Sequence, residues 1–113
     1  MFVENSSVDI LSITKQLGIR VIKDSAVHVL EPNTHGKYLT DGNTAVIVYD
    51  DKCSTAQARF AIAHELGHMM MNHATEYMAF VKKLEQQADS FAQQLLSVSP
   101  IHVPDIIEDF LAR

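Results

Sequence analysis

Two histidines and a glutamate with helical spacing are the residues of this sequence best suited to do chemistry. His64, Glu65 and His68 form an H-E-x-x-H motif. Because residues four apart on an α-helix lie on nearly the same face, about 6 Å apart along the axis, His64 and His68 can bind one metal ion from the same side. Glu65 then lies beside the ion, where a general base can take a proton from a metal-bound water. The motif predicts a catalytic zinc site that contains its own base.

A third metal ligand has to come from another part of the chain, because a catalytic zinc ion usually has three protein ligands and one open position. Glu85 offers a carboxylate on a second predicted helix, and Asp89 follows one turn later on the same face. Metal-bound histidines commonly donate their other ring N–H to a carboxylate, which fixes the tautomer. The sequence therefore predicts Glu85 as the third ligand and Asp89 as the hydrogen-bond partner of His64.

Other residues fit the third ligand position less well. A three-histidine pattern would need glycine at position 71 and histidine at position 74, where the chain has Met71 and Ala74, and His73 misses the place by one residue. Glu76 follows the motif too closely for the first helix to end and a second one to turn back. A structural metal site, closed by a fourth ligand such as His73 or Cys53, remains an alternative.

The residues around the motif resemble those of a known family. They are RFAIAHELGH at Arg59 to His68, EQQADSFAQQLL at Glu85 to Leu96, and Pro100. This pattern is similar to that of the ImmA/IrrE group of small metallopeptidases, and the pairing of H-E-x-x-H with E-x-x-A-D is shared with the wider gluzincin class. The resemblance runs from about Ala45 to Pro100. Relatives often have glutamate and methionine where this chain has Gln87 and Ser99, and neither position is a predicted ligand.

The resemblance implies a zinc-dependent endopeptidase with one Zn²⁺ ion, or Mn²⁺ in its place, and a protein substrate. Relatives cut a helix-turn-helix repressor of a phage, a mobile element or a stress regulon, so the substrate expected here is such a repressor. In gluzincins a strand at the sheet edge, before the active-site helix, pairs with extended substrate. By analogy the substrate-binding strand consists of Gly36, Lys37, Tyr38, Leu39 and Thr40.

Two further points about the site stay open at this stage. The residues that could each stabilise the oxyanion are His35, Tyr38, His73, Tyr77 and His102. A regulatory module that binds protein without cutting it, such as one half of a toxin and antitoxin pair, is the alternative function. The presence of Glu65 argues against that alternative, because a module without chemistry has no need for the base.

Composition favours a small intracellular enzyme. The chain has 113 residues, of which 47% are hydrophobic, so we expect residues 1–113 to form a single metallopeptidase domain with one modest core. One cysteine excludes an internal disulfide. A net charge of −5 without a long basic cluster disfavours direct nucleic-acid binding, and neither a signal peptide nor a membrane span is evident. We therefore expect a cytoplasmic protein, whose oligomeric state the sequence does not predict.

The elements that must position these residues predict an α+β fold. We expect a minimal zincin-like domain, in which a three- to four-stranded mixed sheet packs against the H-E-x-x-H helix and the second metal helix, with short N- and C-terminal helices. The metal-bearing helix should run from 55 to about 72, with a capping box formed by Ser54 and Gln57, and the second from 80 to 97. Gly67 inside the first of these helices suggests close approach of a neighbouring element.

The remaining elements follow from turn and cap signals. Ser6 or Ser7 can cap a first helix, with apolar positions at Val8, Leu11, Ile13 and Leu17, that ends at Gly18. Short strands are expected at Ile19–Ile22 and Ala26–Leu30, then a hairpin of Lys37–Thr40 and Thr44–Tyr49 around Asp41-Gly42-Asn43. Pro104 should open a last helix at Asp105–Ala112.

Overall fold

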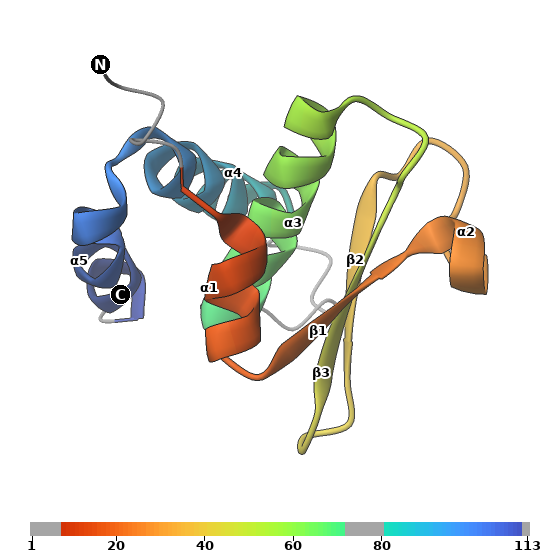
Figure 1. Cartoon of the computed structure of the whole chain (residues 1–113), viewed down its shortest axis with the longest axis horizontal. Helices are drawn as coiled ribbons and strands as arrows, with labels where there is room; N and C mark the ends of the chain where they lie inside the picture. The colour runs from red at the N-terminus through yellow and green to blue at the C-terminus, as the bar shows by residue number, and fades with distance from the viewer. Residues whose placement is uncertain (1–7, 72–80, 112–113) are drawn as a thin grey trace.

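The computed structural model describes residues 8–71 and 81–111 and has an α+β fold (Figure 1). A three-stranded mixed sheet lies beside a group of helices, as the sequence predicts. The helix that carries the H-E-x-x-H motif packs on the sheet, and the helix that carries Glu85 packs on that helix. No helix in the described part of the chain is long and apolar enough to cross a membrane.

The sheet is built from β1 (Ile19–Lys23), β2 (Gly36–Thr40) and β3 (Ala45–Tyr49), in the order β1-β3-β2. β1 pairs in parallel with β3, and β2 pairs antiparallel with it. The predicted hairpin is therefore correct, and Gly42 in its turn has a φ of 93°, which glycine adopts without strain. Among the described residues β2 pairs with β3 alone, so it lies at an edge of this sheet.

The first helix, α1 (Ile10–Gln16), starts later than predicted. Its N-cap is Asp9, whose carboxylate accepts a hydrogen bond from the backbone N–H of Ser12 at 3.2 Å. The predicted caps Ser6 and Ser7 lie outside the described residues. Gly18 follows the helix with a φ of 78°, as expected for a glycine that ends a helix.

The predicted strand at Ala26–Leu30 is wrong, because this segment begins in a short helix, α2 (Asp24–Val27). The Asp24 carboxylate accepts hydrogen bonds from the backbone N–H groups of Val29 and Leu30 at 2.8 and 3.0 Å, which folds the chain back on itself. His28 follows the helix in a left-handed conformation with a φ of 54°. The apolar residues of this segment favour a strand, but these local hydrogen bonds compete with sheet pairing.

The helix α3 (Thr55–Met70) carries the H-E-x-x-H motif and begins with the predicted capping box. The Ser54 hydroxyl accepts from the backbone N–H of Gln57, and the Gln57 side chain accepts from the backbone N–H of Ser54, both at 3.1 Å. The helix packs on β2 and β3 with one side and on α4 (Val81–Ser97) with another. It therefore stands between the sheet and the second metal helix (Figure 1).

Close contact between α3 and α4 depends on small residues. A Cβ atom on Gly67 would lie 3.0 Å from Cδ2 of Phe91 and 3.3 Å from Cα of Ala88, which is the packing reason that the sequence predicts for this glycine. Ala88, Phe91, Ala92 and Leu95 are all fully buried on the facing side of α4. The two metal helices are thus held in a fixed relation by a dense apolar contact.

The chain ends in a short 3-10 helix, Pro100–His102, followed by α5 (Val103–Leu111), which packs against α4. This last helix begins two residues earlier than predicted, so Pro104 lies inside its first turn, where its missing N–H costs no hydrogen bond. Ala112 lies outside the described residues.

Candidate metal centre

The two histidines of the motif and Glu85 converge on one point. His64 Nε2 lies 2.9 Å from Glu85 Oε1, and His68 Nε2 lies 3.0 Å from Glu85 Oε2. The two Nε2 atoms are 3.1 Å apart. Three potential ligand atoms from α3 and α4 therefore surround a space about as large as one metal ion.

The hydrogen-bond partners of His64 fit a cation in this space. The ionised Asp89 carboxylate can only accept, so the hydrogen of a neutral His64 is on Nδ1, which lies 2.8 Å from Asp89 Oδ1. The lone pair on His64 Nε2 then faces a carboxylate oxygen of Glu85. Two acceptors at this distance repel each other unless a cation lies between them. Two imidazoles and one carboxylate are also a donor set that zinc uses.

Burial differs between the two helices that form the site. The side chains of His64 and His68 are 15% and 7% exposed, whereas those of Glu85 and Asp89 are each 51% exposed. The histidines are therefore held inside the protein, and the carboxylates close the site from the solvent side.

Glu65 lies next to this cluster in a more apolar setting. Burial raises the pKa of its carboxyl to about 7, and the Glu85 carboxylate adds to this, while His64 and a backbone hydrogen bond from Tyr38 oppose it. The hydrogen bond is donated by the backbone N–H of Tyr38, which belongs to the edge strand β2. Glu65 is thus held between α3 and the sheet edge.

The other neighbour of Glu65 on the edge strand is Gly36. A Cβ atom at this position would lie 3.0 Å from Cγ and 3.3 Å from Oε2 of Glu65, and 3.4 Å from the Ala61 carbonyl oxygen. Gly36 therefore leaves the space that the Glu65 carboxylate needs.

A cleft of about 730 Å³ joins all these groups. It is lined by one side of β2, the facing side of α3 and Glu85, and its residues include Gly36, Lys37, Tyr38, Glu65 and His68. The Tyr38 ring stacks near His68 with 6.2 Å between ring centroids. The cleft thus runs between the edge strand and the helix that carries the motif.

The residues named as oxyanion candidates separate into three groups. His35 and Tyr38 line the cleft. His102 lies 3.6 Å from Asp105 near the start of α5 and is not among the described residues of the cleft wall. His73 and Tyr77 lie outside the described residues, as does the rival ligand Glu76.

Cys53 does not approach the His64 cluster within the described part of the chain. Its sulfur instead groups with His35 and Asp50. The fourth-ligand role considered for Cys53 therefore has no support, and the same role for His73 falls outside the described residues.

Two features near the site were not foreseen from the sequence. The contact of Glu65 with the Tyr38 backbone leaves no signal in a sequence, because any residue type offers the same N–H. The approach of His35 to Asp50 follows from the observed hairpin register, which places position 35 opposite position 50. The sequence predicts the hairpin but not this register.

Comparison with known proteins gives one match. The family model described as the IrrE N-terminal-like domain, a peptidase family, matches residues 14–96. No curated protein and no solved structure matches the chain significantly. The match covers both metal helices and the sheet, and it confirms the resemblance seen in the residues around the motif.

Proposed function

Because the chain belongs to the peptidase family of the IrrE N-terminal-like domain, we propose that it is a zinc-dependent endopeptidase. The observation that carries this proposal is the convergence of His64, His68 and Glu85 beside a partly buried Glu65 in one open cleft. His64, His68 and Glu85 would hold the ion, with Mn²⁺ as the alternative to Zn²⁺. When bound, such an ion lowers the pKa of a coordinated water and polarises a carbonyl group.

The protein residues have separate roles in this reaction. Glu65 is the general base: its carboxylate takes a proton from the attacking water and passes it to the leaving amine. Asp89 accepts the Nδ1 hydrogen of His64 and so keeps Nε2 available as a ligand. Tyr38 and Gly36 position Glu65, the first through its backbone N–H and the second through its lack of a side chain.

The edge strand supports binding of an extended peptide. Asp50 donates its backbone N–H to the His35 carbonyl at 2.9 Å, so positions 35, 37 and 39 face β3. By the alternation of an antiparallel ladder, the backbone groups of Gly36, Tyr38 and Thr40 point away from β3. A substrate strand that pairs with these groups would lie along the cleft, next to Glu65.

The substrate that we propose is a helix-turn-helix repressor of a phage, a mobile element or a stress regulon. A peptidase of this family implies a protein substrate, and relatives that cut repressors support this narrower choice. The chain would then act in the cytoplasm and release genes from repression through its partner, without touching DNA itself.

The test is to incubate the purified chain and Zn²⁺ with the helix-turn-helix repressor encoded beside its gene. We expect two discrete fragments by mass spectrometry. Glu65→Gln should slow cleavage by about 10² to 10⁴-fold, because it removes the base but keeps the shape of the side chain. Its zinc content should equal that of the wild type.

Glu108→Gln is the matched control, because it makes the same change at an exposed position on α5. It should cleave at the wild-type rate. An intact repressor in the presence of zinc-loaded protein would contradict the proposed substrate. Regulation in cells that survives Glu65→Gln would instead favour the non-proteolytic binding module.

A further inference from the structure

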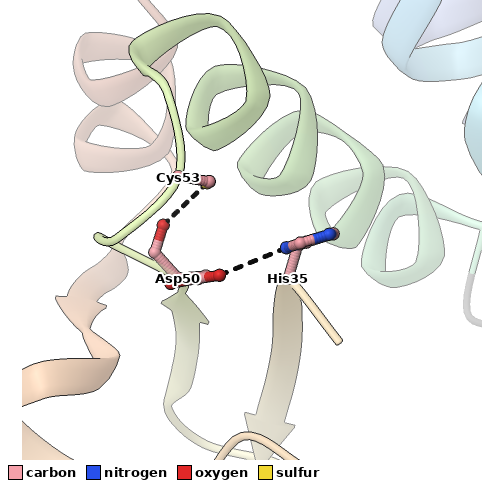
Figure 2. A group of neighbouring side chains, drawn as sticks. All are labelled: His35, Asp50 and Cys53. Carbon is pink, nitrogen blue, oxygen red and sulfur yellow. Dashed lines mark hydrogen bonds and ion pairs between the residues drawn. The ribbon is translucent and has the colours of Figure 1, made fainter. Parts of the chain in front are cut away.

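A second group of potential metal ligands lies beside the cleft, and one of its members, His35, lines the cleft. It consists of His35, just before β2, Asp50, just after β3, and Cys53, in the loop before α3 (Figure 2). His35 Nδ1 is 3.2 Å from Asp50 Oδ2, and one ligand atom from each residue lies within 4.8 Å of the other two. None of the three belongs to the His64 cluster.

We propose that His35, Asp50 and Cys53 form a second, independent binding site for a divalent transition metal of the zinc type. An imidazole nitrogen, a carboxylate oxygen and a thiolate are all zinc ligands, with bonds of about 2.0 to 2.3 Å. Ligand atoms in a tetrahedral site are then about 3.4 to 3.7 Å apart, so the observed spacing needs only small side-chain movements. A thiolate and an imidazole disfavour Mg²⁺ and Ca²⁺, which prefer oxygen ligands.

The backbone already holds these ligands in place without a metal. Asp50 Oδ1 accepts a hydrogen bond from the backbone N–H of Lys52 at 2.9 Å, which orients the carboxylate and leaves Oδ2 towards His35. The backbone pair between Asp50 and His35 fixes the distance between the two strand ends. Ser54, directly after Cys53, is fixed by the capping box of α3. Little conformational entropy is therefore lost when an ion binds.

Metal binding changes one hydrogen bond. The Cys53 thiol now donates to the Asp50 carbonyl oxygen at 3.0 Å (Figure 2). When the sulfur binds a divalent ion as a thiolate, this proton leaves to solvent and the sulfur–metal bond replaces the hydrogen bond. His35 and Asp50 both stay accessible to an incoming ion, with side chains 57% and 25% exposed.

The proposed second site is connected to the cleft through His35. His35 lines the cleft and precedes Gly36, which contacts Glu65. An ion bound here would tie the start of β2, which lines the cleft, to the loop that precedes α3. The second site would thus stiffen the edge strand next to the base.

The test uses Co²⁺ as a probe, because the chain has a single cysteine and the first site contains none. Any thiolate-to-cobalt charge-transfer absorption must therefore come from Cys53. We expect this absorption in the full-length chain. Its intensity should saturate when one cobalt ion per chain has bound at the second site, whether or not the first site is intact. Glu85→Ala should keep it, although that change removes a ligand of the first site.

Variants of each proposed ligand test whether that residue binds the cobalt ion. Cys53→Ser should abolish the absorption, and His35→Ala and Asp50→Asn should each weaken cobalt binding about tenfold or more. His102→Ala, which removes an exposed histidine outside both clusters, should leave it unchanged. An absent band at saturating cobalt would overturn the proposal. So would a band insensitive to both His35→Ala and Asp50→Asn, or saturation at half a cobalt per chain, which would mean a site shared by two molecules.

Discussion

At the scale of single residues, the metal centre depends on which nitrogen of His64 carries its hydrogen. Asp89 decides this, because its carboxylate lies 2.8 Å from Nδ1 and can only accept. Nε2 is then left with a lone pair that faces His68 and Glu85. Asp89 would thus affect how well a metal ion binds at this site without contacting the ion itself.

Replacing Asp89 should therefore weaken metal binding without removing a ligand. We expect Asp89→Ala to lower zinc affinity by about 10- to 100-fold, because His64 loses the group that fixes its tautomer and ring orientation. Competition with a chelating dye measures this affinity directly. Asp89→Asn keeps an acceptor oxygen and should lose less zinc affinity than Asp89→Ala. Equal affinity of wild type and Asp89→Ala would show that His64 is held by other contacts.

The metal-binding residues could be placed together from the sequence because helical spacing fixes their directions. His68 follows His64 by four positions, and Asp89 follows Glu85 by four, so each pair shares a helix face whatever the rest of the fold does. The surroundings of Glu65 could not be placed in this way. They depend on a strand that is distant in sequence, and its contact is made by a backbone N–H.

At the scale of elements, the contact between α3 and α4 sets the geometry of the site. Each helix contributes part of the ligand set, so the separation of the helices controls whether the ligand atoms meet. Gly67 allows the close approach, since it packs against Phe91 and the backbone at Ala88.

Gly67→Ala should destabilise the protein, even though alanine is the better helix former by about 1 kcal/mol. The added Cβ would lie 3.0 Å from Phe91 and 3.3 Å from backbone at Ala88, and backbone cannot move aside cheaply. We expect a net loss of about 1 to 2 kcal/mol in the free energy of unfolding, measured with urea. The loss should shrink when Phe91→Leu makes room. A more stable Gly67→Ala variant would contradict this account.

Elements that depend on neighbouring residues in the sequence were predicted well. An element for which sheet pairing competes with local hydrogen bonds was not. The capping box at Ser54 and the turn at Gly42 depend on residues next to each other in sequence, and both are confirmed. At Ala26–Leu30 the apolar residues favour a strand, but the backbone N–H groups of Val29 and Leu30 instead donate hydrogen bonds to Asp24, which precedes the segment. The apolar composition of the segment does not reveal this competing interaction.

At the scale of the whole molecule, carboxylates near the surface accept hydrogen bonds that stabilise the segments between helices and strands. Asp41 accepts hydrogen bonds from the backbone N–H groups of Asn43 and Thr44 in the hairpin turn, both at 2.8 Å. Asp51 accepts from the side chain and backbone of Ser25, which joins α2 to the end of the sheet. These hydrogen bonds hold the pKa of both carboxyls below the ordinary value of 3.8.

The direction of these shifts predicts how stability depends on pH. A pKa that is lower in the folded state means that the group stabilises the fold above its unfolded pKa and loses this effect as pH falls through the folded pKa. Urea midpoints should therefore decrease from about pH 5 to about pH 2.5. Asp41→Asn keeps an acceptor oxygen but does not titrate, so its decrease should be smaller. Identical decreases in both proteins would contradict the role of Asp41.

The backbone groups of β2 that point away from β3 also limit which peptide sequences could bind in the cleft. Tyr38 already donates its N–H to Glu65, so a peptide paired with β2 must supply N–H groups of its own at every second residue. Proline lacks this group and would be rejected at those positions whatever its neighbours. A helix in the target would first have to unwind, because its N–H groups are used internally. Selection would thus begin with how readily a segment of the target opens, before any side chain is recognised.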